Sequence, residues 1–305
     1  MRFSLIIATK ARPEPLWAAL VSAAATLPAE GEVIVVDGDP ERSARAVVER
    51  SRAEHAQLVV RCLHHGGGSA VQRNVGIDAA EGDVVVFIDD DCTIQEGMFA
   101  ALEAAYADPG VVGATGRIQR APRAGIVAEP DSRLRWLVLG GGRQGTMNSF
   151  GFRRPIFDVE AARDVEYMPG PLMSARREVA AAVRFDEQLS DYALGEDDDF
   201  SYRVSRCGRV RYEPAARVTH HELGFSQMDR RALDRLRVVN RSYLFKKNFA
   251  QTPRAKVEFA GLLAVLCAHR VLNREWAGLR GLMEGMWEVT RSNGVAPGLH
   301  PRNRN

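Results

Sequence analysis

The chain has 305 residues, of which 46% are hydrophobic and 26% are charged, with 41 basic and 39 acidic side chains. That apolar fraction is ordinary for a globular protein and excludes wholesale disorder, while the formal net charge of +2 argues neither for nor against a nucleic-acid partner. The charge is unevenly distributed, because the residues from Ser226 onward carry 15 Lys and Arg against 6 Asp and Glu. The chain therefore combines an acidic body with a basic tail.

Strand-like and helical segments alternate over the first hundred residues. Runs rich in β-branched residues predict short buried strands over residues 3–8, 33–37, 58–62 and 84–89. Helices are expected between and after them, over residues 16–27, 42–52, 70–80 and 97–107, and a fifth strand over 111–118. This alternation predicts right-handed crossovers and an α/β fold with a mostly parallel sheet flanked by helices on both faces.

The signal weakens between Arg120 and Val165, where prolines and glycines interrupt any period, so long loops are expected there. A helix is then expected over residues 196–207, with Gly208 as its C-cap, followed by a strand over 210–220. Three helices are expected in the tail. A capping box of Ser226 and Asp229 would start the first, Thr252-Pro253 the second, and the third would span residues 273–291.

The faces of the tail helices suggest how they pack. One apolar stripe is expected on the first helix, at Leu233, Leu236, Val239 and Tyr243, and one on the third, at Trp276, Leu279, Met283 and Met286. Three glycines of the third helix would allow close helix packing, in a homodimer among other arrangements: Gly278, Gly281 and Gly285. Basic residues crowd the first helix, either as a solvated face or as a surface attracted to anionic lipid.

No uncharged stretch approaches the ~20 apolar residues that a membrane-spanning helix needs. The apolar run at the N-terminus is also too short for a signal peptide. The four cysteines are scattered without a C-x-x-C pair, which suits a reducing compartment. The expected location is therefore the cytoplasm, with peripheral contact at the inner face of the cell membrane through the basic helices as an added expectation.

Three adjacent acids, Asp89, Asp90 and Asp91, follow the most apolar strand, VVVFI. In open α/β sheets, ligands bind beyond the carboxyl ends of the strands. Hard carboxylate oxygens suit Mg²⁺ or Mn²⁺, which commonly also hold substrate phosphates. A solvated turn is the alternative interpretation, since acid clusters can also be structural.

A second acid cluster, from Glu196 to Asp199, lies at the start of a predicted helix. The helix dipole favours negative charge there, so a structural role is one interpretation. The other is that one cluster holds a metal while the second supplies a general base. His220 and His221 end the next strand and point to opposite faces, so at most one of them should bind that metal.

A glycine run, Gly66 to Gly68, precedes Arg73 on a predicted helix. The glycines permit close backbone approach, and an arginine there would pair with a diphosphate through two hydrogen bonds. Neither a P-loop nor a dinucleotide-binding fingerprint is present in the sequence.

Together, these motifs resemble, in their order, the family 2 inverting glycosyltransferases of the GT-A fold, including bacterial rhamnosyl- and galactosyl-type sugar transferases. The matching segments cover about residues 1–225 and include AVQRNVGIDAAEGDVVVFIDDDC, MPGPLMSARREV and GEDDDFSYRVSRCGRVRYEPAARVTHHE. Two segments depart from the family pattern, Ala8 to Arg12 and Asp37-Gly38, which leaves the recognition of the nucleotide base open.

The resemblance implies a role for each matching position. The residues implied to bind the nucleotide sugar are Thr9, Arg12, Asp37, Arg73, Asp89 and Asp90. Asp89, Asp91 and His220 are implied to hold a divalent metal, Mg²⁺ or Mn²⁺, and Asp197 to be the catalytic base. The implied reaction is a metal-dependent, inverting single displacement that moves a sugar from a nucleotide sugar to a hydroxyl of a glycan or lipid-linked acceptor, as in polysaccharide synthesis for the cell envelope.

Residues 1–225 are expected to form the catalytic domain, with a nucleotide-binding half over 1–118 and an acceptor half over 119–225. Residues 226–305 would form the basic helical region. Two other functions stay open: a metal-dependent nucleotidyltransferase and a non-catalytic sugar-nucleotide binding protein. A nucleic-acid partner is not expected, because the basic residues lie on amphipathic helices without a binding motif.

Overall fold

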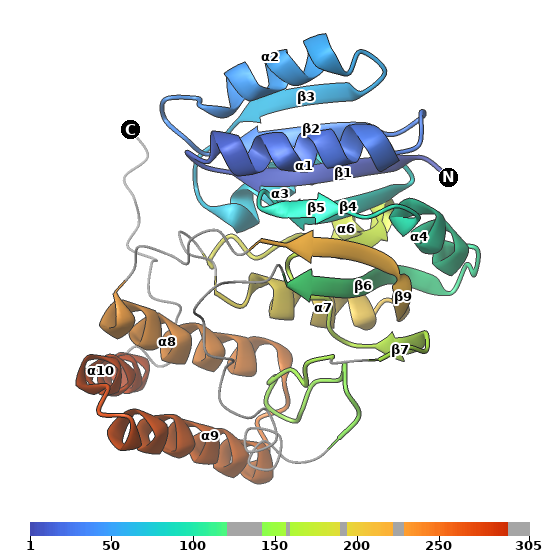
Figure 1. Ribbon diagram of the computed structural model, residues 1–305. Coiled ribbons are helices and arrows are strands. Elements are labelled where there is room, and N and C mark those ends of the chain that lie inside the picture. The colour runs from blue at the N-terminus through green and yellow to red at the C-terminus, as the bar shows by residue number, and fades with distance from the viewer. Residues whose placement is uncertain (121–141, 157–158, 190–193, 222–228, 292–305) are drawn as a thin grey trace. The chain divides into compact units, whose positions relative to one another are not determined.

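The structure is a computed structural model that describes residues 1–120, 142–156, 159–189, 194–221 and 229–291 (Figure 1). Contacts between residues divide this part of the chain into two units. The first contains residues 1–120 and 156–221 as far as they are described, and the second contains residues 142–155 and 229–291. Residues 142–155, which the sequence assigns to the acceptor half, thus group with the C-terminal helices.

The first half of the central sheet consists of parallel strands in the order β3-β2-β1-β4. These strands are β1 (Phe3–Thr9), β2 (Glu32–Asp37), β3 (Val59–His64) and β4 (Val84–Asp89). The crossover helices between them are α1 (Pro13–Thr26), α2 (Ala44–Glu54) and α3 (Ser69–Ala79). β1, β2 and β4 are buried along almost their whole length, as expected for strands covered on both faces. The predicted elements of this half are confirmed, with ends that differ by a few residues.

The second half of the sheet mixes strand directions. β8 (Met173–Arg176) runs antiparallel to both β4 and β6 (Val111–Arg120), whereas β9 (Arg209–His220) is parallel to β6. Two three-residue strands, β5 (Cys92–Ile94) and β7 (Arg163–Val165), pair antiparallel with β9. β5 directly follows the three acids, so its pairing with β9 brings the end of β9 beside them.

The helices of the first unit cover the sheet on two faces. One face buries the apolar residues of α1, α2 and α4 (Met98–Tyr106) in a single core cluster. On the other face, Phe200 of α7 (Glu196–Ser205) packs edge-on against Phe87 of β4, with ring centroids 5.8 Å apart. Phe185, which follows α6 (Arg177–Val183), stacks on Phe200 at 4.1 Å. This aromatic cluster fixes α7 against β4.

The predicted C-cap at Gly208 is wrong. α7 ends at Ser205, and Arg206 is its C-cap in a right-handed helical conformation. Gly208 instead allows a close approach, because a Cβ there would lie 2.6 Å from Cγ1 of Val112 and 3.2 Å from the carbonyl oxygen of Gly110. A glycine after a helix is therefore not always its cap; here the neighbouring strand excludes a side chain.

The second unit contains three helices, α8 (Arg230–Asn248), α9 (Pro253–Leu272) and α10 (Trp276–Arg291). Thr252 caps α9 through a hydrogen bond from the N–H of Ala255, as predicted from Thr252-Pro253. The capping box is wrong in its details: Asp229 is the N-cap of α8 and accepts from the N–H of Ala232 at 2.7 Å, whereas Ser226 lies outside the described residues. None of the described helices combines the length and the apolar character needed to cross a membrane.

α10 packs through the glycines singled out in the sequence, whereas its predicted apolar stripe is only partly buried. Trp276 and Met283 are 57% and 58% exposed, whereas Gly281 is buried against α8. A Cβ at Gly281 would lie 2.1 Å from the backbone oxygen of Arg231. The glycine face, which also includes Gly278 and Gly285, therefore packs within the chain.

Most arginines of α8 are held in ion pairs, so the strongly basic face expected there is largely neutralised. Arg231 pairs with Glu284, and Arg235 pairs with Glu288 at 2.8 Å. Asp234 is fully buried and receives hydrogen bonds from both Arg237 and Arg270. These pairs tie α8 to α10 and to the end of α9.

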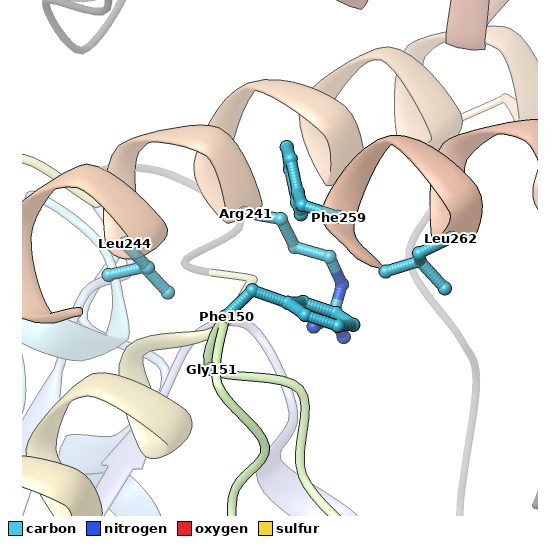
Figure 2. Close-up of a pocket in the computed structure, with 6 residues that line it drawn as sticks. All are labelled: Phe150, Gly151, Arg241, Leu244, Phe259 and Leu262. Atoms are coloured by element: carbon cyan, nitrogen blue, oxygen red, sulfur yellow. The ribbon is translucent and has the colours of Figure 1, made fainter. Parts of the chain in front are cut away.

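Aromatic residues form a separate core in the second unit. The buried members are Phe150, Phe245, Ala255 and Leu262. Figure 2 shows Phe150 near Leu244 of α8 and near Phe259 and Leu262 of α9. The ring centroids of Phe150 and Phe259 lie 5.9 Å apart. A Cβ at Gly151, which has φ of +80°, would lie 2.4 Å from the Phe249 ring, so this turn requires glycine.

Candidate active site

The loop after β1 and the three acids at the end of β4 lie side by side at the carboxyl ends of these two strands. The parallel register pairs Ala8 with Asp89, which brings Thr9 and Arg12 beside the three acids. The hydroxyl of Thr9 donates to Oδ2 of Asp90 at 2.8 Å, and Nη1 of Arg12 donates to Oδ1 of the same residue at 2.6 Å. Burial raises the pKa of Asp90 to about 6, although Arg12 and Thr9 act in the opposite direction. Asp90 is therefore held inside the protein by two side chains of the β1–α1 loop.

Asp91 faces the end of β9. Its Oδ1 lies 3.1 Å from Nε2 of His220, and its Oδ2 accepts from Nη2 of Arg12 at 2.8 Å. Burial alone would raise the pKa of Asp91, but hydrogen bonds from His220 and Arg12 outweigh it and lower the pKa to about 2. Asp91 is thus an ionised carboxylate at neutral pH, next to an imidazole.

The ligand atoms of Asp91, Cys92 and His220 lie within 4.8 Å of one another, which suits a metal ion. A carboxylate oxygen and an imidazole nitrogen are donor types that Mn²⁺ accepts. Burial raises the pKa of the Cys92 thiol, which keeps it protonated, and thiols suit softer metals. Asp91 and His220 therefore fit a divalent cation, and Cys92 is the outlying member of the group.

Arg73 joins the two acid clusters that the sequence singles out. Its Nη2 donates to Oδ1 of Asp89 at 3.0 Å, and its Nη1 donates to Oε1 of Glu196 at 2.8 Å. Arg73 is only 4% exposed, so it lies between the clusters instead of projecting into solvent. Burial also raises the pKa of Glu196 to about 7; the Arg73 charge lowers it and the Asp197 charge raises it.

Asp197 occupies the first turn of α7, after Gly195 with φ of +99°. Its Oδ2 accepts from the hydroxyl of Tyr167 at 3.1 Å and from the N–H of Gly170 at 3.3 Å. The charge of Asp197 affects the pKa values of both Asp89 and Arg73, so this carboxylate lies near the predicted metal residues. Its two hydrogen bonds from Tyr167 and Gly170 come from neutral donors. The acids therefore lie in two groups, one around Asp91 and one around Asp197, and the roles inferred for them from the sequence stay predictions.

Asp37 is already engaged with the backbone. It is 1% exposed, and its two carboxylate oxygens accept from the N–H groups of Asp39 and Ala44, both at 2.9 Å. Asp37 therefore shapes the turn from β2 into α2. Gln72 of α3 reinforces the same edge by donating to the carbonyl oxygens of Thr9 and Val36.

His221 has a different side-chain partner from His220. Its Nε2 lies 3.0 Å from Oγ1 of Thr93. A cavity of about 190 Å³ opens at this side of the acids, and its lining comprises Glu14, Pro15, Ala18, Asp91, Thr93 and His221. The two histidines therefore face different surroundings, and only His220 contacts the carboxylate of Asp91 in the metal group.

Several residues of this site were missed from the sequence. Tyr167 gave no motif signal, and its partner Asp197 is 30 positions away in the chain. Glu196 was seen only as a member of an acid run, although its link to Arg73 spans 123 positions. The EDDD run at a helix start could have indicated that each acid needs a separate partner, because adjacent carboxylates repel one another.

Comparison with known proteins agrees with these motifs. Residues 4–161, just over half of the chain, match the model described as Glycosyl transferase family 2. The chain belongs to this family. Among curated members, the pre-mycofactocin glycosyltransferase of Mycobacterium tuberculosis is 30% identical over 195 residues, which is 62% of this chain and 37% of that relative. The chain thus spans less than two fifths of the length of the curated relatives that it matches.

Solved structures show the same fold for this family 2 member. The mannosyltransferase PcManGT from Pyrobaculum calidifontis superposes with a TM-score of 0.56 at 17% identity, covering 96% of this chain and 76% of that one. S. aureus TarS 1–349 superposes with a TM-score of 0.57 at 17% identity, covering 96% and 92%. At such identities the likeness establishes the fold alone. The predicted GT-A fold and the predicted family are both confirmed.

Proposed function

We propose that this chain transfers a sugar from a nucleotide-sugar donor to a hydroxyl group of a glycan or lipid-linked acceptor. Support comes from the family and from what the neighbours bind: PcManGT was solved with GDP-Man and Mn²⁺, and TarS with UDP-GlcNAc. The observation that carries the proposal is the pair of separate acid groups, Asp91 with His220 and Asp197 with Tyr167, joined by the Asp89–Arg73–Glu196 chain.

The donor side of the reaction needs a partner for the leaving diphosphate. In our proposal, Asp91 and His220 would hold a divalent cation, Mg²⁺ or Mn²⁺. Asp89 is a further ligand only by the family resemblance, because among the described residues the metal group comprises Asp91, Cys92 and His220, and Asp89 contacts Arg73 instead. When bound, such a cation supplies positive charge that stabilises the negative charge developing on the diphosphate. Thr9 and Arg12 act on the donor through the acids that they hold. Because the carboxylate of Asp37 already accepts hydrogen bonds from two backbone N–H groups, we assign it a role in shaping the pocket for the nucleotide base.

The acceptor side needs a proton acceptor, and Asp197 is our candidate. Its carboxylate takes the proton of the acceptor hydroxyl, and the oxygen forms a bond to the anomeric carbon of the sugar. The bond from that carbon to the diphosphate breaks at the same time, and the diphosphate leaves with the bonding electrons. A single displacement of this kind inverts the anomeric configuration. Tyr167 and the N–H of Gly170 hold Oδ2 of the base in one orientation.

The substitution Asp197→Asn tests this assignment, because it keeps the shape of the side chain and removes its basicity. We expect transfer to be lost while metal-dependent binding of the donor, measured by calorimetry, changes by a few fold at most. Glu178→Gln is the matched control, since Glu178 is an exposed acid in the first turn of a neighbouring helix, α6. Full transfer by Asp197→Asn would show that Asp197 is not the base.

A further inference from the structure

Helix α9 carries apolar residues on two faces. Its inner face packs Ala255, Phe259 and Leu262 into the aromatic core of the second unit, where the ring centroids of Phe259 and Phe245 lie 5.1 Å apart. Phe259 and Leu262 are shown in Figure 2. A helix needs one apolar face to pack against its own core. A second apolar face therefore requires its own explanation.

The outer face of α9 is exposed along four turns. Its residues are Val257, Ala260, Gly261, Ala264, Val265, Ala268, Val271 and Leu272. They recur at helical spacing, and none of them is charged. Val257 is 72% exposed and Leu272 is 82% exposed. Scattered exposed apolar residues are ordinary, but a continuous stripe marks an interaction surface.

Basic residues bracket this outer face. Lys256 precedes it, and Arg274 follows it in the turn to α10. Neither forms an ion pair with any residue that the structure describes, in contrast to the paired arginines of α8. Trp276, which is 57% exposed, begins α10 just beyond Arg274. Tryptophan and arginine or lysine beside an apolar stripe are typical of helices that lie in a membrane interface.

A second copy of the chain fits this face less well. The 16 residues from Val257 to Leu272 span about 24 Å of helix, and a helix is about 10 Å wide, so the footprint is small against the ~800 Å² per partner of a standard protein interface. Antiparallel pairing of two such faces would also bring Lys256 of one copy toward Arg274 of the other, and like charges repel. An anionic surface complements both cations.

We propose that the outer face of α9, with Lys256, Arg274 and Trp276, binds the surface of a lipid bilayer that contains anionic lipid. The apolar side chains enter the boundary between headgroups and acyl chains, and the two cations contact the headgroups. This proposal does not depend on the transferase activity, because the face belongs to the second unit and its test uses no sugar. It moves the membrane contact expected from the sequence away from the arginines of α8.

The test measures co-sedimentation of the full chain with vesicles. We expect binding to vesicles of phosphatidylcholine mixed with phosphatidylglycerol at low salt, weaker binding at high salt, and little binding to phosphatidylcholine alone. Val265→Glu and Leu272→Glu, which place a charge in the stripe, should each lower the partition coefficient about tenfold or more. Val59→Glu is the matched control, since Val59 is a 53% exposed valine in β3 of the other unit.

One further variant separates the electrostatic contribution to binding from the apolar one. Lys256→Gln combined with Arg274→Gln should remove most of the salt dependence while leaving the fold unchanged by circular dichroism. Absence of binding to the mixed vesicles at low salt would overturn the proposal. So would wild-type vesicle binding by Leu272→Glu, and a dimer that this substitution converts to a monomer would then assign the face to a second copy of the chain.

Discussion

Tyr167→Phe removes one hydroxyl from the neighbourhood of the proposed base and is expected to lower turnover with little change in donor binding. The lost bond, from Tyr167 to Oδ2 of Asp197, is 3.1 Å long, and the N–H of Gly170 still donates to the same oxygen at 3.3 Å. Hydrogen bonds to charged groups contribute about 1.5–3 kcal/mol, and the length of this bond and the remaining donor favour the lower end. Since about 1.4 kcal/mol corresponds to a tenfold rate change, kcat should fall about tenfold.

The assay is the release of nucleoside diphosphate at saturating donor and acceptor, with KM for the donor measured in parallel. Tyr212→Phe is the matched control: Tyr212 is 3% exposed against 4% for Tyr167, and its hydroxyl donates to the carbonyl oxygen of Val159 at 3.2 Å, in the sheet. If the Tyr167 hydroxyl had a purely structural role, its removal would lower kcat no more than removal of the Tyr212 hydroxyl does. Equal kcat values in the two variants would refute the view that Tyr167 positions the base.

Four further substitutions test other parts of the molecule. Gly281→Ala should destabilise the fold by about 3 kcal/mol in chemical denaturation, because its Cβ would lie 2.1 Å from the backbone oxygen of Arg231. Gly261→Ala should instead stabilise the fold by about 1 kcal/mol, because a Cβ at Gly261 has no heavy atom within 4 Å and alanine favours a helix more than glycine does. Burial alone would raise the pKa of Glu32, but its hydrogen bonds outweigh this and lower the pKa from 4.5. Its ionised form therefore stabilises the fold above pH 4.5, and Glu32→Gln should be less stable than the wild type at pH 7, with the difference vanishing as the pH falls well below 4.5. Asp91→Ala should weaken Mn²⁺-dependent donor binding at least about tenfold by calorimetry, through loss of a metal ligand.

Each of these expectations has a result that would contradict it. If Gly281→Ala and Gly261→Ala were equally stable, the close packing of α8 against α10 at Gly281 would not contribute to stability as we infer. If the stability difference between the wild type and Glu32→Gln grew as the pH fell, the ionised form of Glu32 would not be the stabilising one. Unchanged donor affinity of Asp91→Ala in the presence of Mn²⁺ would remove this residue from the metal site.

The parallel half of the sheet could be predicted from the sequence because its strands are continuous apolar runs, such as VVVFI before Asp89. The short antiparallel strands β5 and β8 could not be predicted in this way. β5 and β8 have three and four residues, too few for a period to be recognised, and the paired residues of β4 and β8 are 86 or more positions apart in the chain. For α10 the close packing of the glycines was predicted, but the apolar stripe misled in part, because Trp276 is exposed.

Most members of the candidate site could be singled out in the sequence, with Tyr167 an exception, but the contacts between them could not. The acids, Arg73 and His220 stand out because several charged or polar residues follow predicted strands and begin predicted helices. What each one contacts depends on long-range pairing: Arg73 bridges Asp89 and Glu196, and the β5–β9 pairing places Cys92 opposite His220. The charge states depend on the same long-range contacts: burial raises the pKa of Glu196, whereas hydrogen bonds from His220 and Arg12 outweigh burial and lower the pKa of Asp91.

The central claim, transfer of a sugar from a nucleotide-sugar donor, is tested most directly by the phosphorus-containing product. The purified chain is incubated with Mn²⁺ and a panel of UDP-, GDP- and dTDP-sugars, and the reaction is followed by ³¹P nuclear magnetic resonance. The account predicts release of a nucleoside diphosphate from at least one donor, lost on chelation of the metal and in Asp197→Asn. Formation of pyrophosphate in place of a nucleoside diphosphate, or no reaction with any donor and acceptor, would contradict it.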